Sequence, residues 1–276
     1  MVQDLPLFPL HSVLCPGIAL PLHIFELRYR LMIGRCIERE QAFGVVLIRD
    51  GREVGESAGR IARVGTSAVI KQAGRYPDGR MDIVTVGARR FRIVNVDEKS
   101  EPYLIGRVTW LDDPMGGLPG EAEEAAQRVG SRFLEYLERL RPAPTPGGAT
   151  PGGATREGER TEEAPFDMLA EMSPAPGVQA PEPFMAGDDV GDGPRRELLL
   201  ASARRLIRTG DATAVSYLLT GLVQLDLSIR QELLELPDTA ARLRRLDLLL
   251  AREIGLLGQH LRPLALDLGS LVARRN

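Results

Sequence analysis

A tract of 52 residues, 142–193, constrains this chain more than any other feature of the sequence. It holds nine prolines and nine glycines, and ten acidic residues against two basic ones. Such a segment buries too little apolar surface to offset the entropy cost of ordering its backbone. We therefore interpret it as a flexible insertion. It separates a β-rich region, 1–115, and a connecting helix, 116–141, from a helical region, 194–276.

Short runs rich in β-branched residues dominate the first region. Residues 5–10 (LPLFPL) indicate an extended run whose prolines confine it to a sheet edge or an irregular strand. The stretches 60–73 and 80–96 flank Pro77-Asp78-Gly79, a turn signal, so they predict a β-hairpin. With about six strands expected in all, the region is predicted to be a compact, mostly antiparallel barrel or sandwich. One helix is expected within it, from apolar residues at three- and four-residue spacing: Phe25, Tyr29, Met32, Ile33, Cys36 and Ile37.

Helical spacing of apolar residues marks the rest of the chain outside the insertion. A connecting helix is predicted over 121–140, and further helices over 195–208, 211–224, 228–236 and from about 239 onward. Helices joined by short loops pack as an antiparallel bundle. In the last of them Arg242, Arg245 and Arg252 are expected to lie off the apolar stripe, which is formed by Leu243, Leu246, Leu250, Ile254 and Leu257.

Two apolar runs interrupt the acidic insertion. They span 166–172 and 183–185. Weak docking of these runs onto another surface is one interpretation, and the favoured interpretation of the tract is a solvated linker.

Composition excludes several functional classes. The chain has only two lysines, Lys71 and Lys99, and neither follows a glycine, so the Gly-Lys pair of a phosphate-binding P-loop is missing. The formal net charge of −3 argues against non-specific nucleic-acid binding. No apolar run approaches the roughly 20 residues of a membrane helix, and no basic segment leads into an apolar one at the start. We expect a cytoplasmic protein that does not bind membranes.

Residues capable of catalysis or metal binding do not form a known motif. Cys15, His23 and Cys36 lack the Cys-x-x-Cys or His-x-x-x-His spacing of a zinc site, and two cysteines cannot build a disulfide framework. No Gly-x-Ser-x-Gly sequence occurs. Ser57 and Lys99 could form a Ser-Lys pair, but neither has a context that builds an oxyanion hole. We expect no cofactor, no metal and no catalytic residue.

Two further clusters can be interpreted in more than one way. The run from Arg89 to Arg92 combines charge with an aromatic ring; strand alternation places Arg90 and Arg92 on one face, which favours a solvated strand face over a nucleic-acid site. The other cluster is apolar, and it is either core or part of a groove for apolar peptide segments. Its members are the candidate peptide-binding residues: Phe8, Leu20, Leu22, Phe25 and Tyr29.

Several motifs resemble the start of the amino-terminal, substrate-binding domain of Lon proteases. The resemblance is dense over 2–112 and looser over 195–258. It begins with 5–10 (LPLFPL), 13–17 (VLCPG) and 20–30 (LPLHIFELRYR), and it continues through shorter matches: 43–46 (FGVV), 53–55 (EVG), 64–66 (VGT), 78–80 (DGR), 86–87 (VG), 90–91 (RF) and 102–103 (PY).

The resemblance implies an α+β fold: a β pseudo-barrel with one helix, followed by a helical bundle. It also implies a role in recognising protein substrates. Because the motor and protease motifs are missing, we expect a stand-alone, non-catalytic polypeptide-binding module in protein quality control. Its expected partners are unfolded or apolar protein segments. Two alternatives stay open: a hydrolase whose active site the sequence does not reveal, and an adaptor whose acidic insertion docks an ATP-dependent protease.

Overall fold

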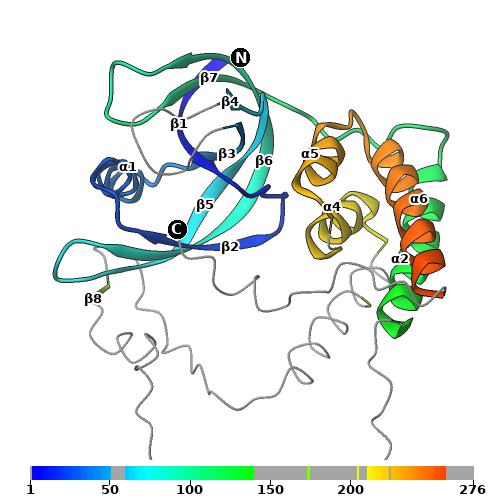
Figure 1. Cartoon of the computed structure of the whole chain (residues 1–276). Helices are drawn as coiled ribbons and strands as arrows, with labels where there is room; N and C mark the ends of the chain where they lie inside the picture. The colour runs from blue at the N-terminus through cyan, green and yellow to red at the C-terminus, as the bar shows by residue number, and fades with distance from the viewer. Residues whose placement is uncertain are drawn as a thin grey trace, which may run out of the picture.

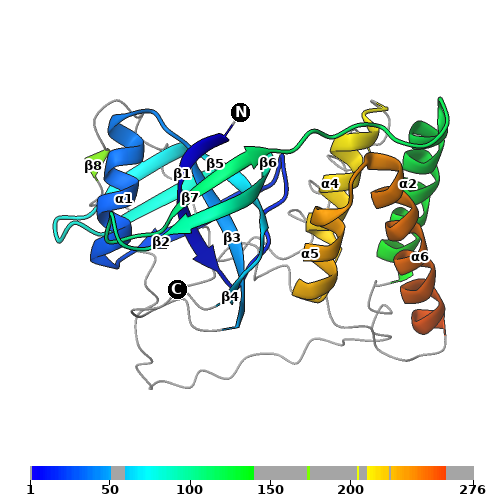
Figure 2. The same ribbon diagram turned by 90° about the horizontal axis from the view of Figure 1, so that it is seen from above.

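The computed structural model describes residues 2–50, 60–139, 173–174, 204, 210–223 and 225–258. These residues form a mixed α+β structure, so the predicted α+β class is confirmed. Strands and one helix occupy one side of the molecule and the remaining helices occupy the other (Figure 1). The turned view shows the same division (Figure 2). Most of the 142–193 tract lies outside the described residues.

Strand pairing in the first part closes on itself. The strands are β1 (Val2–Leu10), β2 (Ala19–Ile24), β3 (Phe43–Asp50), β4 (Arg60–Ile61), β5 (Val64–Arg75), β6 (Met81–Asp97) and β7 (Ile105–Trp110). Hydrogen-bonded neighbours run from β6 to β7, β1, β3, β5 and back to β6. Only the β1–β3 pair is parallel among the described strands. β2 lies outside this ring and pairs with the first part of β6.

The sequence predicts an edge strand or an irregular strand for 5–10, and the structure shows that β1 changes its pairing partner midway. Residues Val2–Pro6 pair with β7, and Leu7–Leu10 pair with β3. Each half of β1 therefore has a strand partner on one side only. A proline has no N–H group to donate to a neighbouring strand. Pro6 and Pro9 are tolerated in β1 because each lies in a half of the strand that has a neighbouring strand on one side only.

The predicted hairpin and first helix are both confirmed. β5 and β6 pair along most of their length, and Gly79 closes the turn between them at φ +84°. Helix α1 (Leu27–Glu38) buries the predicted stripe, including Tyr29, Met32 and Ile33, against the strands. Figure 1 places α1 on the side of the strands opposite the other helices.

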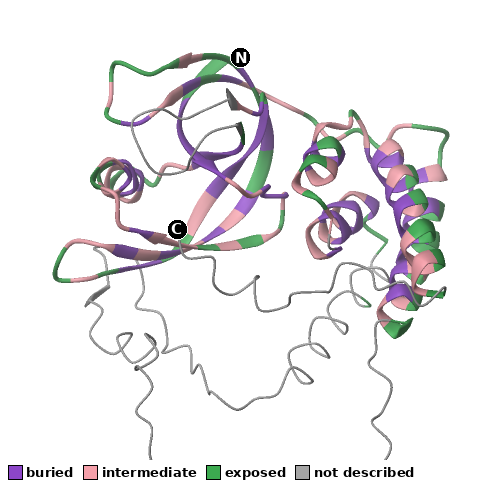
Figure 3. Ribbon diagram, viewed as in Figure 1, coloured by how far each residue is buried: buried purple, intermediate pink, exposed green. Residues whose placement is uncertain are grey.

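Four helices form the second part: α2 (Glu121–Arg139), α4 (Ala212–Leu222), α5 (Leu227–Glu235) and α6 (Thr239–Gly258). The apolar faces of α2, α4 and α6 meet in one core that includes Phe133, Leu219 and Leu246. Figure 3 shows the buried sides of these helices turned toward one another. The helix predicted over 195–208 lies outside the described residues, apart from Arg204, which is helical.

Two predicted solvent-facing arginines are buried instead. Arg90 of β6 is 1% exposed and Arg242 of α6 is 0% exposed. Both lie where the helices pack against the strands, beside a small core that joins Val64, Tyr217 and Leu234. The pairing of β5 with β6 also shifts register just before Arg90, so simple alternation fails there. The prediction of a solvated face was wrong for Arg90, whereas Arg92 is exposed.

Candidate polypeptide-binding surface

The five candidate peptide-binding residues divide into two groups. Phe8 and Tyr29 are buried between β1 and α1, where their rings stack with centroids 4.2 Å apart. Leu20, Leu22 and Phe25 are only half-buried. Phe8 and Tyr29 therefore contribute to the core, and the three others are the members of the cluster that solvent can reach.

β2 presents an open strand edge beside these residues. It pairs with Met81–Val86 of β6 on one side and has no strand on its other side among the described residues. Leu20 and Leu22 point from the same face of β2 onto the core below. Pro21, between them, is exposed. A proline on an edge strand is a common way to limit uncontrolled strand pairing.

Two exposed apolar side chains on α1, the helix that follows β2, were missed by the sequence analysis. Leu27 is 77% exposed and Leu31 is 41% exposed. They lie one helical turn apart, so they share a face of α1 that points away from the buried stripe. The signal was present, because both leucines fall off the predicted stripe. We call Leu20, Leu22, Phe25, Leu27 and Leu31 the α1–β2 surface.

A polar cluster fixes β2 to the hairpin next to that surface. The Asp82 carboxylate lies 2.5 Å from Nδ1 of His23 and accepts a hydrogen bond of 2.6 Å from the Tyr76 hydroxyl. The His23 ring also stacks near the ring of Phe25, at 6.1 Å between centroids. Burial, reinforced by the bond to Asp82, raises the pKa of Tyr76 to about 12. Tyr76 therefore stays protonated and continues to donate at physiological pH.

The His23–Asp82 pair resembles the acid–base half of a hydrolytic triad. In the described part of the chain, no serine or cysteine forms a hydrogen bond with His23. Ser57 lies outside the described residues. Within the part of the chain that the structure describes, the pair therefore has no hydrogen-bonded nucleophile.

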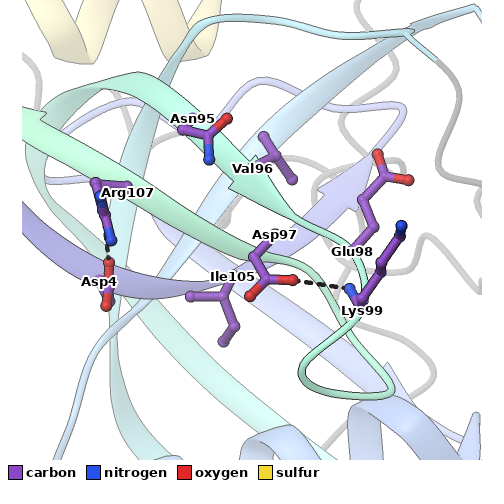
Figure 4. Close-up of a pocket in the computed structure, with 8 residues that line it drawn as sticks. All are labelled: Asp4, Asn95, Val96, Asp97, Glu98, Lys99, Ile105 and Arg107. Atoms are coloured by element: carbon purple, nitrogen blue, oxygen red, sulfur yellow. Dashed lines mark hydrogen bonds and ion pairs between the residues drawn. The ribbon is translucent and has the colours of Figure 1, made fainter.

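A polar hollow of about 430 Å³ lies at the β6–β7 turn (Figure 4). Asp97 accepts hydrogen bonds from the backbone N–H groups of Lys99 and Ser100, and these bonds lower the pKa of its carboxyl. Asp4 and Arg107 form an ion pair at 3.7 Å on one wall. Asp97 is thus bound to the turn and Asp4 to an ion pair. The hollow holds no histidine, serine or cysteine.

The two cysteines are buried and unreactive by their surroundings. Burial raises the pKa of Cys15 to about 12 and that of Cys36 to about 11, so both remain thiols at neutral pH. Within the described residues, no group of three or more His, Cys, Asp or Glu side chains could hold a metal ion. His260 lies outside them.

A polar network joins the strands to the helices. The Arg90 guanidinium donates to the carbonyls of Leu234, Leu236 and Asp112, at 2.7 to 2.9 Å. It also lies 2.6 Å from a carboxylate oxygen of Asp113. Because these partners come from α5 and from the segment before α2, one side chain connects three parts of the fold.

Arg242 completes this network from α6. It reaches the same Asp113 oxygen at 3.3 Å and donates to the Ser216 hydroxyl at 2.9 Å. Its guanidinium also lies over the ring of Tyr217, 3.9 Å from the centroid. Burial lowers the pKa of Arg242. These contacts hold the helices in one orientation against the strands.

No helix among the described residues is long and apolar enough to cross a membrane.

The described residues therefore form a mixed α+β domain with an exposed apolar surface beside an open strand edge. One family model, the ATP-dependent protease La (LON) substrate-binding domain, matches residues 4–252. Because this match spans most of the chain, the protein belongs to the LON substrate-binding domain family.

Curated relatives agree with this assignment. Lon protease 2 of Myxococcus xanthus is 29% identical over 143 residues, which are 51% of this chain and 17% of that protein. Lon protease of Anaeromyxobacter dehalogenans is 31% identical over 141 residues, again 51% of this chain and 17% of that protein. The chain thus spans less than a fifth of the length of these relatives.

Two solved structures are similar over nearly their whole length. The Lon N-terminal domain protein from Xanthomonas campestris is 23% identical, with a TM-score of 0.49, covering 90% of this chain and 98% of that one. The N-terminal domain of the Mycobacterium avium complex Lon protease is 15% identical, with a TM-score of 0.48, covering 92% and 98%.

Proposed function

We propose that this protein is a non-catalytic module that binds unfolded or apolar polypeptide segments in protein quality control. The family match over residues 4–252 carries the proposal. An ATP-dependent protease is the further partner that the relatives suggest. The structure supports binding rather than hydrolysis, because the His23–Asp82 pair has no bonded nucleophile among the described residues and both cysteines stay protonated.

We further propose that different segments of the chain have different roles. The closed strand ring corresponds to the family's pseudo-barrel, over 1–115, and the packed helices to its helical bundle, over 194–276. Residues 116–141 connect the two, and 142–193 form an insertion. In this scheme the barrel recognises polypeptide, while the buried Arg90–Asp113 network holds the bundle against it.

The α1–β2 surface is the proposed contact site. A polypeptide that covers Leu27 and Leu31 removes apolar area from water, worth about 25 cal/mol per Å². A patch of a few hundred Å² supports weak, roughly micromolar binding when main-chain hydrogen bonds to an open strand edge add to it. Half-buried Leu20, Leu22 and Phe25 provide the floor of the contact.

Titration with a reduced and carboxymethylated, permanently unfolded protein tests the function. We expect saturable binding in the micromolar range. The double variant Leu27→Ser, Leu31→Ser should weaken that binding at least 10-fold. Leu248→Ser is the matched control, because Leu248 of α6 is 65% exposed and lies on the helical part. Its affinity should stay within 2-fold of the wild type.

Two outcomes would overturn these proposals separately. Absence of binding up to high micromolar concentration would remove the proposed function. Equal loss of binding in the Leu27/Leu31 and Leu248 variants would remove the α1–β2 surface as its site. Peptide-bond cleavage that co-purifies with the recombinant protein would favour the hydrolase alternative.

A further inference from the structure

The far half of β5 has a second open edge. β3 pairs with β5 only at residues Thr66, Ser67 and Ala68. Beyond Ala68, none of the strands β1, β3, β6 and β7 pairs with this side of β5. The opposite side continues to pair with β6 as far as Arg75. An edge of this kind offers unpaired backbone groups for strand addition.

A short segment of the acidic tract already uses this edge. β8 (Ser173–Pro174) pairs antiparallel with β5, Ser173 opposite Arg75 and Pro174 opposite Gly74. Figure 1 shows β8 beside the β5–β6 hairpin. The pairing joins residues almost a hundred positions apart, so it is a tertiary contact and not a local turn.

The surroundings of this edge fit what lies before Ser173 in the sequence. Residues 166–172 form one of the two apolar runs in the tract. The β5–β8 pairing ends with Ser173 opposite Arg75, next to the hairpin turn where Arg30 of α1 donates to the carbonyl of Asp78 at 2.9 Å. The exposed leucines of α1, Leu27 and Leu31, lie within one turn of Arg30.

One face of α1 also approaches the edge directly. Leu27, Leu31 and Gly34 follow one another at four- and three-residue spacing, so they share that face. A side chain at Gly34 would meet the guanidinium of Arg75, 3.9 Å away. The Leu27–Leu31 face and the end of β5 therefore border the same region.

Charge favours the same arrangement. The tract 142–193 carries ten acidic and two basic residues. The exposed side chains of the β5 edge include Lys71 and Arg75. Opposite charges attract an acidic segment to a basic edge and raise the rate of such docking.

We propose that residues 166–174 occupy the β5 edge and the Leu27–Leu31 face of α1 in the same molecule. The apolar run covers the leucines, and Ser173–Pro174 extend the sheet. The tract is then a tethered competitor that reduces access of other polypeptides to this surface. The docking of Ser173–Pro174 rests on the strand pairing, and the placement of 166–172 rests on the apolar run and on charge, whereas the competition rests on the proposed polypeptide binding.

A disulfide test probes the docking in the full chain. Directly paired residues of antiparallel strands have Cα atoms about 4.5 to 5.5 Å apart, within the range of a disulfide. Under mild oxidant, the variant Arg75→Cys, Ser173→Cys should cross-link at least 10-fold faster than the matched control Lys71→Cys, Ser173→Cys. Native Cys15 and Cys36 are buried and do not compete. Equal rates for the two variants would overturn the docking.

A deletion tests the competition. A variant without residues 166–183 should bind the unfolded probe at least 5-fold more tightly than the full chain. A labelled peptide of residues 164–176 should bind that variant at least 10-fold more tightly than the full chain, and a scrambled peptide of the same composition should bind neither.

The outcomes separate the two proposals. Peptide binding without any binding of the unfolded probe would preserve the docking and remove the proposed function. Unchanged probe affinity after the deletion, with binding intact, would overturn the competition.

Discussion

The guanidinium of Arg90 lies 2.6 Å from the carboxylate of Asp113, at the junction between the strand ring and the helices. Arg90 belongs to β6, and Asp113 precedes α2. The side chain of Arg90 is almost fully buried. Because a charge in such a place needs its partners, this pair makes the orientation of the helices depend on one side chain.

Loss of the Arg90 guanidinium should therefore destabilise the whole protein. Arg90→Met keeps most of the volume but leaves the Asp113 carboxylate with only its longer ion pair to Arg242, and it leaves the carbonyls of Leu234 and Leu236 without their donor. We expect the free energy of unfolding to fall by about 3 to 5 kcal/mol. Urea denaturation followed by circular dichroism measures this change.

Arg89→Met is the control for the neighbouring arginine. The Arg89 side chain is mostly exposed; it forms a long ion pair, 3.6 Å, with Asp112 and lies over the Trp110 ring, 5.2 Å from its centroid. Exposed pairs of this kind contribute about 0 to 1 kcal/mol. A similar loss of stability in both variants would contradict a special role for the buried Arg90.

Gly65 of β5 should not accept a side chain. A Cβ there would collide with the carbonyl oxygen of Val45 and lie 2.8 Å from the ring of Phe91. Since backbone and a buried ring cannot move aside cheaply, Gly65→Ala should destabilise the protein by about 1 to 3 kcal/mol. Gly255→Ala in α6 meets nothing within 4 Å and should stabilise it by about 0.5 to 1 kcal/mol. Melting temperatures that shift in the same direction would refute this contrast.

Stability should fall in alkaline solution because of the two buried thiols. Burial raises the pKa of Cys15 from 9.0 to about 12 and of Cys36 from 9.0 to about 11. Above pH 9 the unfolded chain releases these protons while the folded protein keeps them. The stabilisation is complete below pH 9 and is lost as the pH rises, by about 2 kcal/mol for the pair between pH 9 and 10.

The double variant Cys15→Ala, Cys36→Ala isolates this effect. It should be less stable than the wild type at pH 7, because two buried side chains become smaller. Its stability should nevertheless decline less between pH 9 and 10 than that of the wild type. Urea midpoints at pH 8, 9, 9.5 and 10 give the comparison, and parallel pH profiles would contradict the prediction.

Two aspartates at helix starts should differ in their contribution to stability. Asp211 precedes α4, and its side chain accepts a hydrogen bond from the backbone N–H of Ala214 at 2.9 Å. Asp226 precedes α5 without such a bond. Asp211→Ala should cost about 1 kcal/mol of unfolding free energy, and Asp226→Ala less than about half of that. Thermal unfolding of the two variants measures the difference. A larger loss of stability in Asp226→Ala than in Asp211→Ala would contradict the prediction.

Much of the fold could be predicted because its signals are local. The hairpin turn at Pro77-Asp78-Gly79 and the stripe of α1 depend on neighbouring residues, and both are confirmed. The candidate site was less accessible to sequence reasoning. Phe8 and Tyr29 share the apolar character of Leu20, Leu22 and Phe25, but composition does not reveal which side chains another element covers.

The sequence by itself determined the α+β class, the hairpin and the apolar faces of the helices, because spacing and turn chemistry act over a few residues. Only the tertiary structure decided that Arg90 is buried and that Leu27 is exposed. Only the tertiary structure decided, too, that Ser173 pairs with Arg75 of β5. Each of these depends on which distant segment packs against a residue, and the desolvation that follows is a property of the assembled fold.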